Sequence, residues 1–317
     1  MVRGFVKCFV FFLGVVVFVY FLFSHLLLVE GSVDFHSVYG SREVSCVSGG
    51  VLDFSCVNCS LLLVTLDTLR ADHVGCYGYP FNTSPFIDGL AGGGLLFEKA
   101  FTSSPTTLPA HTSIFTSLYP RQHGVLTNGW YTANESLVTL AEILALRGYV
   151  TAAFVSTFVL DSRFNLDQGF MLYEDNQSFN KVGEWMGNKN VSGFERRGEE
   201  VSNAALKWFN STPQSPYFAW IHYYDPHMAY QPPAGYTALF DSTSPNYDGE
   251  IRYVDDTLRD LIGELEGMGS LEDTLIVIVG DHGEGLNQHG EAGHGFQLYD
   301  STLHVPFIIV HPRNKTC

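Results

Sequence analysis

The chain has 317 residues, and 46% of them are hydrophobic, so it can bury a sizeable core as one large domain or two small ones. It carries 17 Lys and Arg residues against 33 Asp and Glu residues, for a net charge of −16. This acidic balance argues against nucleic acid as a partner, and it is compatible with metal binding or with solubility alone.

The first 30 residues predict a membrane anchor. From Phe5 to Val29 the chain is almost purely apolar, and this run is long enough for a helix to cross the roughly 30 Å hydrocarbon core of a bilayer. Arg3 and Lys7 lie at its start, so the positive-inside rule places the N-terminus in the cytoplasm and the rest of the chain outside the cell or in a lumen. A cleaved signal peptide is the alternative, but the apolar run is long for one. We therefore expect a single-pass membrane protein anchored by residues 1–30.

Residues 31–57 are rich in Ser, Val and Gly without a sustained period, which predicts a linker between the membrane and a domain at residues 58–317. In an extracytoplasmic domain, disulfides are plausible among Cys46, Cys56, Cys59 and Cys76, and the sequence leaves their pairing open. Several Asn-x-Ser/Thr triplets agree with a glycoprotein; they begin at Asn58, Asn82, Asn134, Asn176, Asn190, Asn210 and Asn314.

The domain contains alternating strand and helix patterns. Short continuous apolar runs are typical of strands buried on both faces, and they lie at residues 61–66, 150–155, 217–221, 275–279 and 305–310. Helical patterns lie between them, at residues 84–90, 137–144, 201–208 and 247–265. This alternation predicts an α/β fold with a largely parallel central sheet and helices on both faces, preceded by the transmembrane helix. Ligands of such folds bind beyond the carboxyl ends of the strands.

Three of the predicted strands end in carboxylate or imidazole side chains. Asp67 follows the first strand, the histidine-rich run 222–227 follows the third, and Asp281 and His282 follow the fourth. The glycine-rich loop 288–295 adds further histidines. Mixed carboxylate and imidazole ligands suit zinc or manganese, whereas oxygen ligands alone suit calcium or magnesium. The sequence therefore predicts a divalent metal site at this edge of the sheet.

A hydroxyl-rich stretch at residues 104–111 predicts the start of a further helix. Thr107 lies just ahead of Pro109, and proline is favoured at the first helical position because it lacks an N–H. An oxyanion bound beside Thr107 would then meet free backbone N–H groups at the positive end of the helix dipole. A Ser/Thr run before a helix is most often a cap, so the stretch gains meaning only together with the strand ends.

These segments together resemble the sulfatase family, within the alkaline phosphatase superfamily. The matching segments occur in the family's order, cover roughly residues 60–311 and are highly specific as a set; they lie at residues 63–73, 107–116, 118–120, 225–227, 280–284 and 303–306. The resemblance implies the same α/β fold and an enzyme that hydrolyses or transfers sulfate or phosphate esters.

The resemblance also implies a role for each matching residue. Asp67, Thr107, Asp281 and His282 are the implied metal ligands, and Thr107 is also the implied nucleophile. Two histidines fall where the family places groups that hold the ester's oxygens or protonate the leaving group; they are His227 and His294. Further residues carried over are His111 and His123 for substrate binding, and Asp225 as a ligand to a second metal ion.

The chain departs from the arylsulfatases at the nucleophile. They carry Cys or Ser in a Cys/Ser-x-Pro-x-Arg motif that is oxidised to formylglycine, whereas the same frame here begins with Thr107 and ends in His111. Threonine cannot form that aldehyde, and a metal-bound threonine alkoxide is what the phosphatase and phosphoglycerol-transferase branches use. Thr68 also replaces the second adjacent aspartate of the calcium-binding sulfatases, which again favours a transition metal. We therefore expect a Thr-nucleophile variant that favours phosphoryl transfer.

Two other functions remain compatible with the sequence. One is a true sulfuric ester hydrolase that uses Thr107 without formylglycine, and the other is a non-catalytic, membrane-anchored binding module derived from the fold. The expected substrate is a small-molecule, lipid or glycan ester. The sequence ends at Cys317, where relatives continue with a smaller C-terminal subdomain, so we expect that subdomain to be absent.

Overall fold

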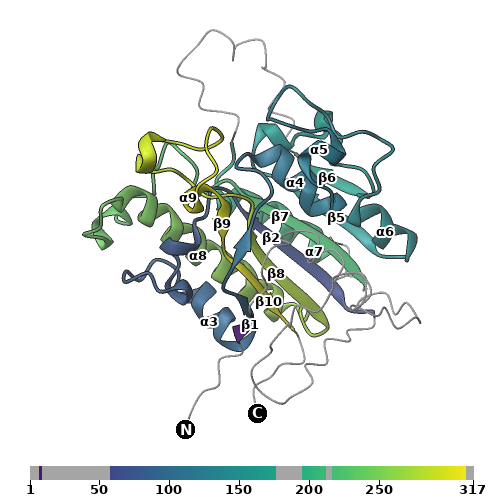
Figure 1. The fold of residues 1–317 in the computed structure, drawn as a ribbon. Helices are drawn as coiled ribbons and strands as arrows, with labels where there is room; N and C mark the ends of the chain where they lie inside the picture. The colour runs from purple at the N-terminus through teal and green to yellow at the C-terminus, as the bar shows by residue number, and fades with distance from the viewer. Residues whose placement is uncertain (1–6, 9–57, 176–194, 212–215, 312–317) are drawn as a thin grey trace.

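The computed structural model describes residues 7–8, 58–175, 195–211 and 216–311 (Figure 1). The predicted anchor, residues 1–30, and the predicted linker, residues 31–57, lie outside the described residues apart from Lys7–Cys8, which form strand β1. Within the described part of the chain, no helix is both long and apolar enough to cross a membrane. The membrane anchor therefore stays a prediction.

The centre of the described structure is an eight-stranded sheet with the strand order β1-β3-β10-β8-β2-β7-β5-β6. Besides β1, its strands are β2 (Ser60–Leu66), β3 (Leu95–Phe97), β5 (Val150–Phe154), β6 (Leu172–Glu174), β7 (Tyr217–Tyr223), β8 (Thr274–Gly280) and β10 (Phe307–Val310). The five strands from β8 to β6 are parallel to one another, and every residue of β2 is buried. The predicted α/β fold with a largely parallel sheet is confirmed.

The last predicted strand differs from the prediction in two ways. Pro306 lacks a backbone N–H and divides residues 305–310, because it cannot donate to a ladder of hydrogen bonds. The first part becomes β9 (His304–Val305), which pairs with β4 (Ala100–Phe101) in a separate two-stranded sheet. The second part, β10, runs antiparallel to both β8 and β3. The sheet is therefore mixed at this edge.

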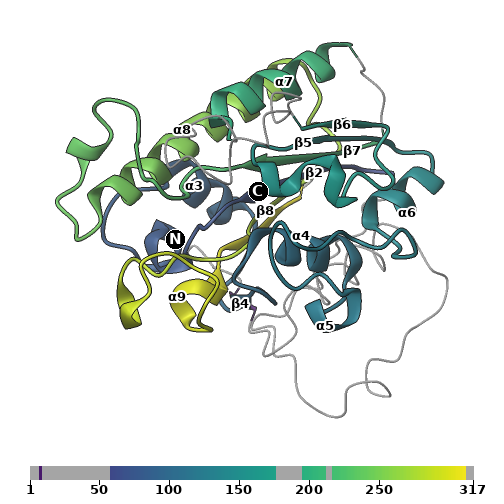
Figure 2. The same cartoon turned by 90° about the horizontal axis from the view of Figure 1, so that it is seen from above.

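Helices cover both faces of the sheet, as predicted (Figure 2). On one face lie α3 (Pro85–Gly93), α7 (Gly198–Ser211) and α8 (Pro245–Gly267), whose apolar side chains pack with Leu62 and Val64 of β2. On the other face lie α4 (Thr107–Thr116), α5 (Pro120–His123) and α6 (Leu140–Leu146), and side chains of α4 and α6 pack with Leu61 and Leu63. The alternation of β2 between two apolar cores explains its continuous apolar sequence.

The remaining helical elements are short. The helix α9 spans Asp300–Leu303, and the 3-10 helices are η1 (Ala71–His73), η2 (Gly75–Tyr77), η3 (Phe158–Leu160), η4 (Ser162–Phe164), η6 (Thr237–Leu239) and η7 (Gln288–Gly290). Helix α6 begins later than the pattern at residues 137–144 predicts, because Thr139 and Glu142 form a reciprocal capping box at its start.

Side chains from other elements cap two of the helices. Asp255 of α8 accepts hydrogen bonds from the backbone N–H groups of Phe86 and Ile87, in the first turn of α3. Asp225, which follows β7, accepts one from the N–H of Gly198 at the start of α7. These carboxylates satisfy donors that have no partner within their helix, so they fix how the helices enter the fold.

The structure describes two of the four cysteines for which disulfides were considered. Cys59 is disulfide-bonded, whereas Cys76 is a free, half-buried thiol.

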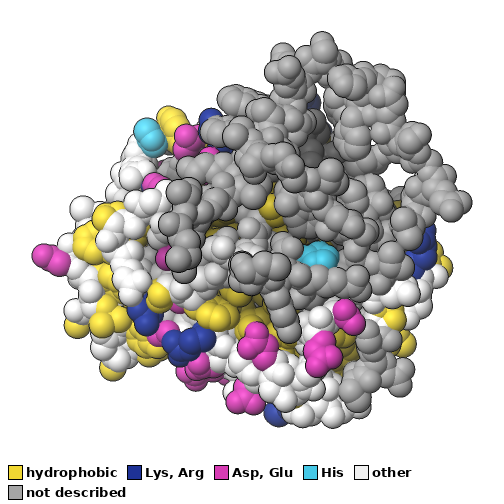
Figure 3. Space-filling model, turned by 90° about the horizontal axis from the view of Figure 1, so that it is seen from below, with side chains coloured by type: hydrophobic (Ala, Val, Ile, Leu, Met, Phe, Trp, Pro, Cys, Tyr) yellow, Lys and Arg dark blue, Asp and Glu magenta, His cyan; other side chains and the backbone are white. Residues whose placement is uncertain are grey.

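On the face drawn in Figure 3, acidic, basic and apolar side chains are interspersed over the part that the structure describes. Charge of one sign does not gather there into a stripe of the kind that follows nucleic-acid phosphates.

Candidate active site and metal centre

The site begins where β2 and β8 end side by side. In the parallel register Leu66 pairs with Gly280, so the next residues, Asp67 and Asp281, leave the same edge of the sheet. The N–H of Asp67 donates to the carbonyl of Tyr223 at 2.9 Å, and that of Asp281 donates to the carbonyl of Leu66 at 3.3 Å. The backbone of both aspartates is thereby held by neighbouring strands, as the sequence predicts for the carboxyl ends of a parallel sheet.

Glycine is required where the loop after β8 passes the segment before β9. A Cβ on Gly283 would lie 2.1 Å from the carbonyl oxygen of Ser301, and one on Gly280 would lie 2.8 Å from that of Leu69. Neither glycine has a positive φ, so the two residues serve the close approach of backbones. The N–H of Gly283 donates to the carbonyl of Thr302 at 2.8 Å, which fastens the Asp281 loop to the helix α9.

The two carboxylates are buried and poorly satisfied. Asp67 and Asp281 are each 1% exposed. The Oδ1 atom of Asp281 accepts hydrogen bonds from the N–H groups of Thr68 and His282, at 3.1 and 2.6 Å. Its Oδ2 atom and both oxygens of Asp67 have no hydrogen-bond partner among the described residues. Buried acceptors without partners are costly, so these three oxygens need a cation or a proton.

The electrostatics of the pair lead to the same conclusion. Burial raises the pKa of Asp67 well above its ordinary value, and the neighbouring Asp281 raises it further. Burial raises the pKa of Asp281 to about 7, against the lowering effect of its hydrogen bonds from His282 and Thr68. Two adjacent carboxylates out of contact with water cannot both ionise unless positive charge is added. A divalent cation between them would supply that charge.

His282 completes a group of buried side chains that could hold a metal ion. Its Nδ1–H donates to the carbonyl of Gly283 at 2.9 Å, which leaves the lone pair of Nε2 free to bind a metal. Nε2 lies 3.5 Å from Oδ1 of Asp67 and 3.5 Å from Oδ2 of Asp281. Burial keeps the pKa of His282 well below its ordinary value, so the ring is neutral, as a ligand must be. The three residues form a buried group that could hold a metal ion.

Thr107 brings a hydroxyl to the same place. Its Oγ1 atom lies 3.2 Å from Nε2 of His282, and the side chain is buried. Distances of 3.2–3.5 Å among these donor atoms match ligands that share one ion, since metal–ligand bonds of about 2.0–2.1 Å at tetrahedral angles separate ligands by roughly 3.4 Å. The four residues that the sequence assigned to the metal therefore lie together, and their donors fit a divalent cation.

The local structure around Thr107 differs from the expectation in one respect. The helix α4 begins at Thr107 itself, after the N-cap residue Thr106, so Pro109 lies at the third helical position instead of the first. The N–H of Leu108 donates to Oδ1 of Asn128 at 2.8 Å, and Pro109 has no N–H. The helix end therefore offers an anion fewer free N–H groups than the sequence suggested.

Two histidines form the rim of this site. His294 lies next to His282, with ring centroids 4.3 Å apart, and next to His227 at 5.0 Å. The Nδ1 atom of His294 lies 3.3 Å from Oε1 of Glu284, which is fully buried. His227 donates from Nδ1 to the carbonyl of Met228 at 2.7 Å, and burial lowers its pKa to about 4. Both rings are only partly buried, so they can reach a bound ester.

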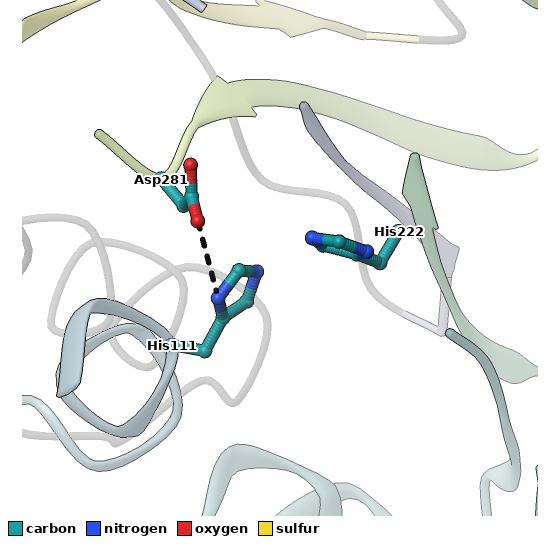
Figure 4. Close-up of side chains that lie close together, drawn as sticks. All are labelled: His111, His222 and Asp281. Atoms are coloured by element: carbon teal, nitrogen blue, oxygen red, sulfur yellow. Dashed lines mark ion pairs between the residues drawn. The ribbon is translucent and has the colours of Figure 1, made fainter. Parts of the chain in front are cut away.

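His111 and His123 have structural partners. Nδ1–H of His111 donates to the carbonyl of Thr107 at 2.8 Å, and its Nε2 accepts from Oγ1 of Thr65 at 3.1 Å. With both nitrogens engaged, His111 has no lone pair for a metal, although its ring lies beside Asp281 (Figure 4). His123 accepts from the N–H of Val125 and donates to Oγ of Ser113, so it joins α4 to the residues after α5.

Both carboxylate oxygens of Asp225 also have hydrogen-bond partners, and neither partner belongs to the metal-ligand group. Its Oδ1 accepts from the guanidinium of Arg197 at 2.7 Å, and its Oδ2 accepts from the N–H of Gly198 at 3.0 Å. Among the described residues, the groups spaced to hold a metal ion do not include Asp225. Its predicted role as a ligand to a second metal ion gains no support from this geometry.

Sequence reasoning gave no role to two residues that the structure places at the site. His222 projects from β7 into the space beside His111 and Asp281 (Figure 4), and its Nε2 atom lies 3.6 Å from Oδ2 of Asp67. Glu284 orients His294, as described above. His222 belongs to the histidine-rich run that drew attention to the end of β7, but it lies within the strand. Side chains along a strand alternate between its two faces, so His222 lies on the same face as Trp220. This alternation is the feature of the sequence that could have pointed to His222.

The comparison with known families decides the assignment. The family model described as Sulfatase matches residues 60–316 of this chain. The chain belongs to the sulfatase family. The fold, the order of the segments and the buried group that could hold a metal ion agree with this membership.

The similarity to individual relatives is distant. The chain is 23% identical over 318 residues to the uncharacterized sulfatase YidJ of Escherichia coli, which covers 81% of this chain and 63% of that protein. It is 24% identical over 295 residues to the ulvan-active sulfatase of Formosa agariphila, which covers 80% of this chain and 56% of that protein. The chain thus spans less than two thirds of the length of these relatives.

Solved structures share the fold. The phosphonate monoester hydrolase of Agrobacterium radiobacter superimposes with a TM-score of 0.65 at 19% identity, over 80% of this chain and 68% of that one. An alkaline phosphatase superfamily protein from Vibrio parahaemolyticus gives a TM-score of 0.60 at 20% identity, over 81% of this chain and 62% of that one. At these identities the likeness establishes the architecture, and the chemistry is argued from the site.

Proposed function

We propose that the chain is a metal-dependent hydrolase or transferase of phosphate esters, with Thr107 as the nucleophile. The observation that carries the proposal is the position of Oγ1 of Thr107, 3.2 Å from Nε2 of His282 and beside two buried carboxylates that lack partners. A nucleophile of this family is expected beside the metal ligands, and the hydroxyl of Thr107 lies in that position. The mixed carboxylate and imidazole ligands favour zinc or manganese over calcium or magnesium.

The chemistry of threonine supports phosphoryl transfer. Formylglycine is an aldehyde that is made from the unbranched side chain of Cys or Ser, and oxidation of the branched Thr107 side chain would give a ketone instead. A direct ester of Thr107 is the covalent intermediate that remains available. Hydrolysis of such an ester needs water to attack phosphorus or sulfur, because the route by which formylglycine eliminates its sulfate is closed.

The residues would then divide the reaction between them. Asp67, Asp281, His282 and Thr107 would hold the cation, which lowers the pKa of the Thr107 hydroxyl and offsets charge on the ester. Thr107 loses its hydroxyl proton to solvent as Oγ1 bonds to phosphorus, and the bond from phosphorus to the alcohol oxygen breaks. The leaving alcohol takes a proton from Nε2 of His294, whose ring is oriented by Glu284.

A second attack completes the cycle. Water, or an acceptor alcohol in a transferase, attacks the phosphorus of the Thr107 ester and restores the hydroxyl. Nε2 of His227 is suited to take the proton of that nucleophile, because Nδ1 already donates to Met228 and a pKa of about 4 leaves the ring neutral at pH 7. His294 would therefore donate a proton in the first step, and His227 would accept one in the second.

Matched substrates test the proposal. Purified protein should turn over an aryl phosphate or an aryl phosphodiester, lose that activity with a chelator, and regain it with Zn²⁺ or Mn²⁺. An aryl sulfate with the same leaving group should react more slowly. Faster turnover of the sulfate would favour the second candidate, a true sulfatase that uses Thr107, to which the names of the relatives point. Absence of both metal binding and turnover would favour a non-catalytic binding module.

We also propose that residues 1–30 anchor the chain, with the catalytic domain outside the cytoplasm. The apolar run from Phe5 to Val29 supports this location. The substrate would then be a glycan, lipid or small-molecule ester that is reached from that side. Protease treatment tests the topology: an extracellular domain is cut on intact cells without detergent, and a luminal domain is cut in sealed microsomal vesicles only after detergent is added.

A further inference from the structure

His222 is a buried imidazole that none of the roles above uses. It lies in β7, opposite Thr65 of β2, and its side chain is fully buried. Its Nδ1 atom lies 2.8 Å from Oγ of Ser156, the only hydrogen bond that the described residues give to either side chain. Its Nε2 atom has no hydrogen-bond partner among those residues, and Oδ2 of Asp67 is 3.6 Å away.

We propose that His222 is a positioning residue which holds Asp67 in place as a metal ligand, and that Ser156 sets the imidazole for this task. The inference rests on the proposed metal centre. Either group of the Ser156–His222 pair can donate, and we assign the hydroxyl of Ser156 as the donor to Nδ1, because the carboxylate oxygen of Asp67 that faces Nε2 lacks a donor. The single N–H of the neutral ring is then on Nε2. That N–H points to Oδ2 of Asp67 and closes to a hydrogen bond when the carboxylate is ionised beside the cation.

The two oxygens of Asp67 face different groups. Oδ1 lies 3.5 Å from Nε2 of His282, on the side of the metal-ligand group, while Oδ2 lies 3.6 Å from His222. One oxygen can therefore bind the cation while the other is fixed from behind. Carboxylate ligands in metal centres are commonly held by such an outer hydrogen bond, and loss of the outer partner typically lowers metal affinity about 10- to 100-fold.

Direct ligation by His222 is the competing arrangement. A ring nitrogen of His222 lies within 4.8 Å of ligand atoms of Asp281 and His111, a second grouping that could hold an ion by distance (Figure 4). His111 has both nitrogens engaged, with Thr107 and Thr65, so it has no lone pair to contribute. That grouping thus reduces to two ligands, whereas the N–H on Nε2 gives Asp67 the donor it lacks.

Ser156 is rigid enough to set the tautomer. It follows β5 and is fully buried, and its carbonyl accepts a hydrogen bond from the N–H of Arg196 at 2.8 Å. The guanidinium of Arg196 in turn holds the carbonyl of Val155, the preceding residue. The hydroxyl is therefore presented to His222 from a fixed backbone.

The test measures Zn²⁺ affinity of the full chain by competition with a chelating dye, independently of any ester substrate. His222→Leu, which has no donor, should bind Zn²⁺ about 10- to 100-fold more weakly. His222→Gln should stay within a few-fold of the natural protein, because its side-chain amide can donate from the position of Nε2. Ser156→Ala should lose only several-fold, because it frees the tautomer and keeps the ring.

His73→Gln is the matched control, because it alters another buried histidine paired with an aspartate, 2.8 Å from Asp248, and should leave Zn²⁺ affinity unchanged. Equal weakening by Gln and Leu at position 222 would overturn the donor role, and so would unchanged affinity in His222→Leu. If His222→Leu does not fold, unchanged affinity in Ser156→Ala together with weak binding by His222→Gln overturns it. A natural protein that binds no divalent metal would overturn the metal centre itself.

Discussion

The floor of the site, Asp67, Asp281 and His282, and its rim, His227 and His294, differ in what holds them. The floor residues follow β2 and β8, and backbone hydrogen bonds to neighbouring strands fix their positions. The rim residues lie in loops, where each ring is held by one hydrogen bond and by ring contacts. The floor is therefore as rigid as the sheet, while the rim depends on a few side chains.

The difference separates binding from selectivity. The buried carboxylates of the floor have oxygens without hydrogen-bond partners among the described residues, so the floor is the part of the site suited to hold a cation. The loop that carries His294 is attached by Arg70, whose guanidinium donates to the carbonyl of Glu284 and to Gln288. Changes in such loops can alter which ester is accepted without altering the metal centre.

The largest loss of turnover should come from substitution of Thr107, the proposed nucleophile. Thr107→Ala should lower kcat for an aryl phosphate by about 10⁴-fold or more, because the covalent route is lost. Thr106→Ala is the control, since that side chain bonds to Ser104 and should leave turnover near the natural level. Substantial turnover by Thr107→Ala with an intact circular dichroism spectrum would show that the nucleophile lies elsewhere.

A rim substitution should reduce turnover and spare the metal. His294→Gln should lower kcat/KM about 100-fold or more for an alkyl phosphate, whose leaving group needs a proton, and less for a nitrophenyl ester. Zn²⁺ affinity should not change. His289→Gln alters a neighbouring histidine that stacks on Tyr299, and it should have little effect on either quantity. Loss of Zn²⁺ in His294→Gln would place that residue in the floor.

The floor should give the metal-free protein an unusual pH dependence. The pKa values of Asp67 and Asp281 are raised by folding, so above about pH 4 the folded protein binds more protons than the unfolded chain. The free energy of unfolding should therefore fall as the pH rises, by up to about 1.4 kcal/mol per pH unit for each carboxyl group that titrates. For Asp281 the fall ends near pH 7.

The buried histidines add a slope of the opposite sign, because they are protonated in the unfolded chain below about pH 6.5 and neutral in the folded protein. The difference in the free energy of unfolding between the natural protein and Asp281→Asn, measured from pH 5 to 8, isolates the carboxyl effect. Chemical unfolding with a chelator present should show the loss of stability, and saturating Zn²⁺ should remove it. Asp67→Asn should abolish tight Zn²⁺ binding and yet stabilise the chelated protein at pH 8. An Asp281→Asn variant that gains no stability over the natural protein as the pH rises, with a chelator present in both, would contradict the raised pKa of Asp281.

The smallest effect concerns His123, for which the sequence predicts a role in substrate binding. His123→Leu removes the hydrogen bonds to Ser113 and Val125, so it should lower the free energy of unfolding by about 1 kcal/mol. KM and kcat should stay unchanged, as measured with the best ester substrate. A raised KM without a loss of stability would return His123 to substrate binding.

The parts of the site that the sequence predicts are those encoded by neighbouring residues. The apolar runs 61–66 and 275–279 end in Asp67 and Asp281, so one pattern gives both the strands and the ligands. His111 and Asp225 carry the right chemistry for a site, but their partners come from elsewhere in the chain. Thr65 and Arg197 occupy them, and no local pattern shows this.

The same limit explains what was missed. The role inferred for His222 depends on Ser156, 66 positions away, and on the face of β7 to which the ring points. The antiparallel course of β10 depends on Pro306 and on pairing with β3, whereas its apolar composition resembles that of the parallel strands. Composition gives the burial of a strand, and the direction of the strand is decided by connections made over a long distance.

The hydrogen bond between the N–H of Thr68 and Asp281 joins positions 213 residues apart. At about 5–20 residues per second, the two halves of the metal centre leave the ribosome roughly 10 to 40 s apart. The loop after β8 is also fastened to Ser301 and Thr302, so Asp281 and His282 reach their final positions only after those residues have been synthesised. Asp67 and Thr107 thus wait in a nascent chain without their partners, and metal capture by the proposed centre would be one of the last events of maturation.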